Sequence, residues 1–375
     1  MSLRQIFPGG IVKPGFNPLA AQTSVTNYNL FAWGGNGNGN LGLGNSTQYS
    51  SPKQVGSLTN WSSISSGYQH VVSIKTDGTL WAWGNNAFGQ LGDGTRTNRS
   101  SPVQVGSLTN WLSVVGGSYF TLATKTGGTL WAWGYNNAGQ LGTGNLTYYS
   151  SPKQVGSLTN WSSVAGGNGF SAAIKTDGTI WAWGQGGYGN LGLGNTTYYS
   201  SPKQVGALTN WSKIDCGPNY VLATTTSGAL YAWGGNSYGQ LGLGNAVNRS
   251  SPNQVGALTT WLNISSGNYF SLSTKTDGTL WTWGRNDAGG QLGLGDITHR
   301  SSPTQVGALT SWLKIAGGNY HSLSIKTDGT LWTWGLGNQG RLGLGDRSDR
   351  SSPVQIGALT DWLQIAGGYA SVALG

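Results

Sequence analysis

The stretch LWAWGYNNAGQLGTG, residues 130–144, decides the fold because altered copies of it recur at a fixed distance along the chain. The spacing is 50 residues and becomes 51 only at the last step, where a second glycine enters the loop DAGGQLG. A period of this length indicates a repeat architecture, here of seven units. The second aromatic residue of each copy is Trp33, Trp83, Trp133, Trp183, Trp233, Trp283 and Trp334.

Each unit contains four strand-like segments. In residues 111–157 they are WLSVVGG, YFTLATK, LWAWG and PKQVG. The second and third are joined by TGGT, or by TDGT in most units, which predicts a two-residue hairpin, with Asp-Gly suited to a type I′ turn. Pro152 is expected at the first position of the fourth strand, where its missing N–H does least harm. Four strands per unit of about 50 residues predict an all-β protein, a seven-bladed β-propeller.

The two ends of the repeat region predict how the ring closes. The chain ends at WLQIAGGYASVALG, after the first two strands of a unit, and the repeats begin at YNLFAWGG, which is a third strand. Together the two halves make one blade, so we expect residues 28–375 to form six continuous blades and one shared between the termini. A solenoid of the same period would need altered capping repeats, and none is visible. Residues 1–27 stand outside the repeat.

Composition agrees with an all-β protein and narrows the function. Glycine supplies 65 of 375 residues, more than twice the usual share of about 7%, and all 11 acidic residues are aspartate. The net charge is +9, but the 20 Lys and Arg are spread evenly, whereas nucleic-acid binders gather theirs in a patch. We therefore expect no nucleic-acid partner. No apolar segment is long enough for a signal peptide or a membrane span.

The residues needed for catalysis or cofactor binding are not gathered in any motif. The segment GNGNGNLGLG formally matches a dinucleotide fingerprint, but no helix follows it to hold the pyrophosphate. His70 and His321 occupy a position that is Phe or Tyr in other units, which favours packing. Cys216 lies in a position otherwise held by Gly or Ser, which favours an inert thiol. We expect no enzyme activity, no metal site and no cofactor.

The segment TDGTLWAWGNNAFGQLGDG, residues 76–94, and its copies resemble the repeat of the regulator of chromosome condensation family. That repeat is built around an aromatic–Gly pair, an Asn and Gly-Gln-Leu-Gly, and the resemblance implies a seven-bladed propeller over about residues 28–375. Functions in this family range from nucleotide exchange and chromatin docking to enzyme inhibition. In the near-identity of its copies, the chain resembles bacterial or phage members of this family more than other members.

Differences between the repeats predict a recognition surface. In a propeller the loops between strands one and two and between strands three and four share one face, and here both sets vary; we call this the varied face. The other connections, KTDGT and QVGSLTNW or QVGALTNW, recur almost unchanged. Tyr and Asn dominate the varied loops, as in adaptable binding loops, although neutral drift is the alternative. The candidate contacts are Tyr68, Phe88, Tyr119, Tyr135, Tyr188, Tyr238, Tyr269, Arg285, Tyr320 and Arg341.

Residues 1–27 are rich in Pro and Gly, which precludes a helix and favours an extended arm. The arm could fold back on its own propeller or anchor the chain to another protein. If the arm is an anchor, the chain is expected to be a non-catalytic structural or recognition propeller of a phage virion, such as a decoration or tail protein. It would then bind other virion proteins through residues 1–27 and a host-surface protein or glycan through the varied face. The alternatives are a bacterial cytoplasmic propeller that binds or inhibits one protein, and a lectin-like glycan binder. The anchoring candidates are Ile6, Phe7, Ile11, Val12 and Phe16.

Overall fold

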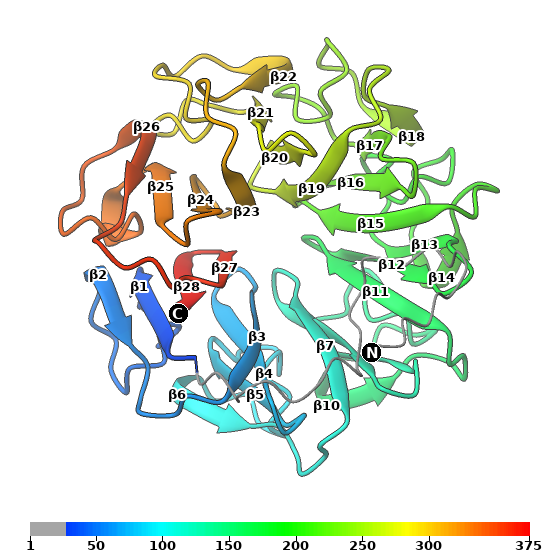
Figure 1. The fold of residues 1–375 in the computed structure, drawn as a ribbon. Coiled ribbons are helices and arrows are strands. Elements are labelled where there is room, and N and C mark those ends of the chain that lie inside the picture. The colour runs from blue at the N-terminus through cyan, green and yellow to red at the C-terminus, as the bar shows by residue number, and fades with distance from the viewer. Residues whose placement is uncertain (1–27) are drawn as a thin grey trace, which may run out of the picture.

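The computed structural model describes residues 28–375, so the arm and its anchoring candidates lie outside the described residues. Seven four-stranded antiparallel sheets are arranged as blades around a central axis (Figure 1). In each blade the first strand lies nearest the axis and the fourth forms the outer edge. The all-β seven-bladed propeller predicted from the repeats is confirmed.

The strands of the six continuous blades follow the chain in order. They are β3 (Trp61–Ser66), β4 (His70–Lys75), β5 (Leu80–Gly84) and β6 (Arg99–Gln104); β7 (Trp111–Gly116), β8 (Phe120–Lys125), β9 (Leu130–Gly134) and β10 (Tyr149–Gln154); β11 (Trp161–Gly166), β12 (Phe170–Lys175), β13 (Ile180–Gly184) and β14 (Tyr199–Gln204); β15 (Trp211–Cys216), β16 (Tyr220–Thr225), β17 (Leu230–Gly234) and β18 (Arg249–Gln254); β19 (Trp261–Ser266), β20 (Phe270–Lys275), β21 (Leu280–Gly284) and β22 (Arg300–Gln305); and β23 (Trp312–Gly317), β24 (His321–Lys326), β25 (Leu331–Gly335) and β26 (Arg350–Gln355), with the short 3-10 helix η1 (Asn338–Gly340) between β25 and β26.

The seventh blade is shared between the two ends of the chain, as predicted. Its strands lie in the order β2 (Tyr49–Gln54), β1 (Leu30–Gly34), β28 (Ala370–Leu374) and β27 (Gln364–Gly367). β1 and β28 pair along their whole length, from Leu30 opposite Leu374 to Gly34 opposite Ala370. Because this pairing joins the first described strand to the last, no blade of the ring is left incomplete.

The outer strands differ from the prediction at their start. Strand β10 begins at Tyr149, three residues before Pro152, so the proline is not its first residue. The pairing of β10 with β9 shifts register between Tyr149 and Lys153, and the proline lies within that irregular segment. An edge strand tolerates this interruption because one side of it has no partner strand.

The hairpin between the second and third strands exists as predicted, but its turn type was wrong. Gly78 has φ of 77°, whereas Asp77 is not in the left-handed region, so the turn cannot be type I′. Gly78 N donates to Lys75 O and Lys75 N donates to Thr79 O, which closes a three-residue loop ending in a glycine bulge. Asp77 selects this loop by accepting hydrogen bonds from both the N–H and the hydroxyl of Thr79.

The Gly-Gln-Leu-Gly corner clamps each blade to the next. Trp133 Nε1 donates to Gln90 O of the preceding blade at 2.9 Å, and the same bond recurs around the ring up to Trp33 and Arg341 O. Gly142 has φ of 72°, and a Cβ on it would lie 2.7 Å from Trp183 Nε1. The glycine is thus required both by its backbone angle and by the approach of the next indole. Leu141 is fully buried beside it.

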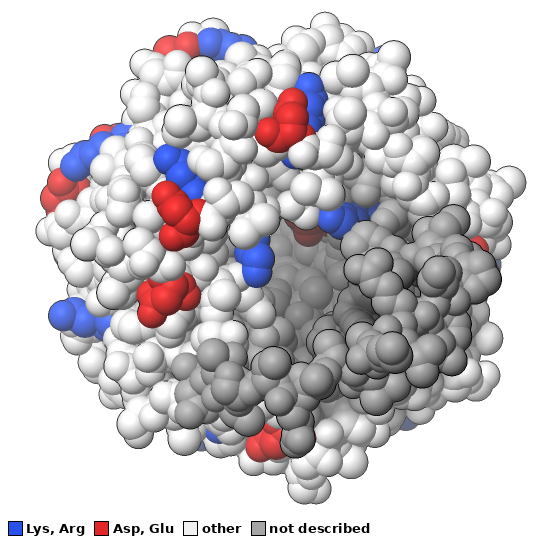
Figure 2. Space-filling model, in the orientation of Figure 1, with Lys and Arg blue, Asp and Glu red and all other residues white. Residues whose placement is uncertain are grey.

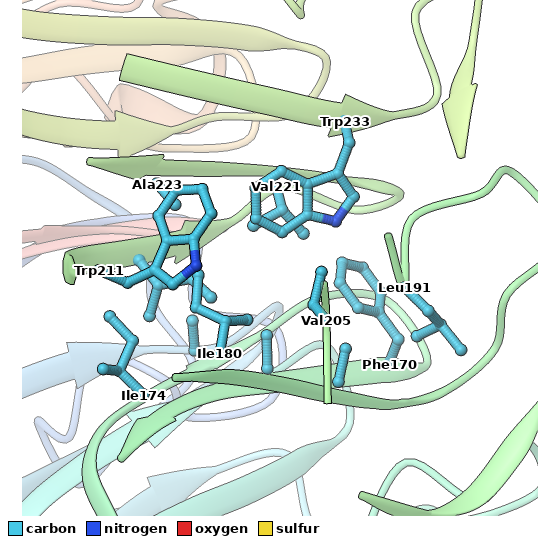
Figure 3. Packing of buried hydrophobic residues seen from close by; sticks show 13 residues of the cluster. Phe170, Ile174, Ile180, Leu191, Val205, Trp211, Val221, Ala223 and Trp233 are labelled. Carbon is cyan, nitrogen blue, oxygen red and sulfur yellow. The ribbon is translucent and has the colours of Figure 1, made fainter. Parts of the chain in front are cut away.

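The hydrophobic core lies between neighbouring blades. Figure 3 shows one such cluster, in which Trp211 and Trp233 of one blade face Phe170, Ile180 and other apolar side chains of the preceding blade. The tryptophan before the last glycine of every LWAWG-type strand is fully buried in such a cluster. Burial of each indole contributes on the order of 3 kcal/mol or more to the free energy of unfolding.

The first tryptophan of the pair has a different environment from the second, because it is only partly buried. Lys125 Nζ lies 3.7 Å from the centre of the Trp131 ring, a cation–π contact that recurs in five blades. Where Thr225 replaces the lysine, Tyr231 replaces the tryptophan. The two positions change together, which indicates that they act as a pair.

Candidate functional site

The varied face is formed by the loops after each first strand (residues 67–69 and their equivalents) and each third strand (residues 85–98 and their equivalents). The constant face is formed by the hairpins and by the linkers from each fourth strand to the next first strand, such as residues 105–110. Contacts between aromatic rings confirm that the two variable sets of loops meet on one side of the ring.

An aromatic run crosses three blades of the varied face. Neighbouring rings in it are 4.6 to 6.1 Å apart between centroids, mostly edge to face. Such geometry is favourable for aromatic pairs and leaves ring edges and hydroxyls available at the surface. The run therefore offers a firm, partly exposed contact area. Its members, in order around the ring, are Tyr369, Tyr68, Tyr119, Phe88, Tyr135 and Tyr148.

A second aromatic group lies on the varied face at the other side of the ring, in loops that follow β17, β19 and β21. Tyr238 packs against Tyr269 with centroids 5.6 Å apart and against the His299 ring at 5.2 Å. The Arg285 guanidinium lies over the Tyr238 ring, and over that of Tyr320 in the next blade. Arg285 is also paired with Asp287 at 2.6 Å, so its charge is neutralised within the face.

The structure places nine of the ten predicted contact residues at least partly in solvent, and Tyr188 is 46% exposed. The prediction for Arg341 was wrong as a surface contact, because its side chain is buried and the residue is only 3% exposed. Arg341 occupies the Gln position of the corner, and that position points inward in every blade. The other copies, Asn40, Gln90, Gln140, Asn190, Gln240 and Gln291, are also buried.

Part of each variable loop is structural. Asn136 is fully buried; its Oδ1 accepts from Leu141 N, and its Nδ2 donates to Asn145 O and Thr147 O. The same asparagine recurs in four other blades. The variation that reaches solvent is thus confined to the residues around it, such as Tyr135 and Ala138.

Sequence analysis missed two members of the aromatic run. Tyr148 immediately precedes the outer strand β10 and contacts Tyr135. Tyr369 lies in the shortened loop of the last unit, and its N–H donates to Tyr68 O. Both could have been found by aligning the units across the ring closure.

The constant face carries an unexpected set of exposed leucines. One leucine in each linker is 45% to 52% exposed, and they recur once per blade: Leu58, Leu108, Leu158, Leu208, Leu258, Leu309 and Leu359. The chain enters the described structure on this face, because Tyr28 forms a bridge with Asn60 of the first linker. The first described residue thus lies beside the leucines.

The innermost strands line a central channel of about 1000 Å³. Lys213 Nζ donates to Leu262 O and to Asn263 Oδ1 of the next blade. Asp215 Oδ2 accepts from Ser266 N at 2.6 Å, and burial raises the pKa of Asp215 to about 6. Burial also raises the pKa of the neighbouring Cys216 thiol, which disfavours the reactive thiolate. These polar groups tie neighbouring blades together.

Charge is scattered over the described surface. In Figure 2 the visible Lys, Arg and Asp side chains form small separate groups on an otherwise uncharged face. Within residues 28–375, no three His, Cys or Asp side chains come together in a way that could hold a metal ion. None of the helices in this part of the chain is long and apolar enough to span a membrane.

The two histidines in the Phe position are packed inside, as predicted. His70 Nε2 lies 3.1 Å from Thr121 Oγ1, which itself donates to Gln90 O, so the ring donates from Nε2. Burial lowers the pKa of His70 to about 4 and that of His321 to about 3. Both rings are neutral in the folded protein at pH 7.

Substituting His70→Phe is expected to make the protein less sensitive to acid. The unfolded chain protonates His70 near pH 6.5, whereas the folded protein resists protonation until about pH 4, so stability is lost as the pH falls between these values. Between pH 7.5 and 5.0 the wild-type free energy of unfolding should fall by roughly 2 kcal/mol more than that of the variant. Urea unfolding at both pH values measures this, and equal losses would contradict it.

Comparison with known families shows to which family the chain belongs. The family model for the RCC1-like domain matches residues 19–234. The model for the regulator of chromosome condensation (RCC1) repeat matches residues 227–273, 277–325 and 328–374, and a second model of that repeat matches 261–289 and 312–341. The chain belongs to the RCC1-like domain family. A search of curated protein sequences gave no match.

Solved structures share the fold of this RCC1-like propeller. Prp20p from Saccharomyces cerevisiae, studied for its binding to Gsp1p and histones, is 22% identical over 94% of this chain and 92% of its own, with a TM-score of 0.83. Yeast RCC1 (Prp20) bound to Kap60 is 21% identical over 99% and 96%, with a TM-score of 0.83. Human WBSCR16 is 22% identical over 93% and 98%, with a TM-score of 0.83. At these identities the likeness shows the fold alone.

Proposed function

We propose that this RCC1-like propeller is a non-catalytic module that recognises a protein through its varied face. The aromatic run from Tyr369 to Tyr148 is the observation that carries the proposal. Tyrosine rings supply large contact areas at a small cost in side-chain entropy, and they are enriched where proteins bind proteins. Protein binding is also described for Prp20, whose partners include Gsp1p, histones and Kap60.

The opposite character of the two faces supports a narrower proposal. The constant face repeats the same exposed leucine in each linker and carries Tyr28, the first described residue, whereas the varied face differs from blade to blade. A module that is mounted on one side and recognises its target on the other needs this division. We propose that the chain is a bacterial or phage-type member carried on a virion, mounted by residues 1–27 and by the constant face on another virion protein.

Site-specific photo-crosslinking tests both parts of the proposal. A photoreactive phenylalanine analogue replaces Tyr135 on the varied face, Leu208 on the constant face or Phe7 in the arm, one position at a time, in the cell that makes the protein. Position 135 should capture one protein, and positions 208 and 7 should capture a different protein that purifies with the particle.

The outcomes separate the alternatives. Capture of a protein at position 208, with no protein captured at position 135, would show that recognition does not use the varied face. Capture from position 7 of a soluble protein, with no particle component, would refute the virion role and favour the cytoplasmic alternative. Capture of glycan in place of protein at position 135 would favour the lectin-like alternative.

A further inference from the structure

Arg341 departs from the repeat by placing a charged side chain at a buried position of the corner. Its position is Gln or Asn in the other six units, where an uncharged side chain holds the loop: Gln90 Oε1, for example, accepts from Phe88 N. The clamp to the next blade uses only the backbone carbonyl. Arg341 O accepts from Trp33 Nε1 at 3.0 Å and from Ser371 Oγ at 2.9 Å, as Gln90 O does from Trp133 and Thr121. The guanidinium is therefore additional to the clamp between blades.

Among residues 28–375 the Arg341 guanidinium forms no ion pair within 4 Å, and Asp349 acts on its charge only from farther away. Nε donates to Asn338 O at 3.1 Å and Nη2 donates to Gln339 Oε1 at 3.0 Å, while the buried Nη1 has no hydrogen-bond partner. The ion pairs of the described residues are formed by Arg99, Arg285, Arg300 and Arg350 instead. An arginine stays charged when buried, and an unpaired buried charge is destabilising.

Tyrosines of the varied face cover this charge. The Arg341 guanidinium lies 5.7 Å from the centre of the Tyr369 ring, and Gln339 Nε2 donates to the Tyr369 hydroxyl at 2.6 Å. The Tyr68 ring meets that of Tyr369 at 6.0 Å. Arg341 thus lies directly beneath one end of the aromatic run, close to the mouth of the channel.

We propose that this end of the varied face binds a carboxylate side chain of the recognised protein, above Arg341 and between Tyr68 and Tyr369. The proposal rests on the function proposed above and specifies the chemistry of its partner. A carboxylate there would supply the missing counterion, and tyrosine hydroxyls can donate to it. The attraction is strong because the site is largely shielded from water, where charges interact several times more strongly than in bulk solvent.

The test uses the full chain and a probe that does not require the partner. The Arg341 Nε–H signal of ¹⁵N-labelled protein is followed by NMR during titration with an acetylated (Asp-Gly)₄ peptide, with its (Asn-Gly)₄ counterpart and with inorganic phosphate. The Asp peptide should give a saturable shift that the Asn peptide does not give. Phosphate binding at least as tight as that of the Asp peptide would overturn the assignment to a protein carboxylate.

Matched variants separate the site from general charge. Arg341→Gln installs the residue that four other units carry, so it should fold normally, and Arg347→Gln removes the same charge from an exposed position of the same loop. Followed through the Tyr68 and Tyr369 ring signals, Asp-peptide affinity should fall at least 10-fold in the first variant and less than 2-fold in the second. Equal losses in both, or no loss in the first, would overturn the proposal. If the captured protein binds the Arg341→Gln variant as tightly as wild type, the carboxylate site fails while the varied face stands.

Discussion

Replacing Val372 with aspartate is expected to prevent the ring from closing and to leave the chain without a stable fold. Val372 is fully buried in β28, opposite Ala32 of β1, in the pairing that joins the two ends of the propeller. It packs in one cluster with Leu30 and with Trp61 and Trp83 of the next blade. A carboxylate there would have no cationic partner in that apolar cluster. The free energy of unfolding should fall by at least about 4 kcal/mol.

The control for this substitution is Val247→Asp, in a loop of the varied face. Val247 is 56% exposed, and its contacts with Asn236 and Asn245 use only its backbone atoms. Guanidinium unfolding and size-exclusion chromatography compare the two variants with wild type. Val247→Asp should match wild type, whereas Val372→Asp should aggregate or unfold at much lower denaturant. A Val372→Asp protein within 1 kcal/mol of wild type would show that closure does not depend on this pairing.

The architecture could be predicted because its determinants repeat. Trp133 and Leu141 fill the same place in every blade, so seven copies of one pattern report the period, the strand count and the shared blade. The glycines of the corner are equally informative, since Gly142 is fixed by both its φ and a neighbouring indole.

Contacts that depend on local backbone geometry could not be predicted in the same way. The Asp-Gly pair suits a type I′ turn, but the bonds from Asp77 to Thr79 hold a three-residue loop instead. The cation–π contact between the partly exposed Trp131 and Lys125 forms across the paired strands β8 and β9. Both depend on the register between strands, which the repeat pattern alone does not specify.

The sequence predicted which face carries the candidate site, but not how its side chains contact one another. The variable loops indicated which residues differ, yet the contacts between Tyr68, Tyr119 and Phe88 cross from one blade to the next. Arg341 was misplaced because variation alone does not distinguish an exposed position from a buried one. The leucines of the constant face were overlooked for the opposite reason, since they hardly vary.

The combined substitution of Tyr68, Tyr119 and Tyr135 by alanine is expected to abolish recognition of the protein captured at position 135. The three rings belong to the aromatic run and are partly exposed, so their removal takes away the centre of the proposed contact area. Central tyrosines of protein interfaces contribute about 2 kcal/mol or more each, although their effects do not add fully. A loss of affinity of at least about 1000-fold, close to 4 kcal/mol, is expected.

The matched control replaces Leu208, Leu258 and Leu309 of the constant face with alanine, which removes a comparable number of exposed apolar side chains. Circular dichroism and urea unfolding establish that both triple variants are folded. The decisive measurement is the dissociation constant of each full-length variant for the captured protein, by calorimetry. The tyrosine variant should lose at least 1000-fold and the leucine variant less than threefold. A tyrosine variant within threefold of wild type, or an equal loss in the leucine variant, would contradict recognition through the varied face.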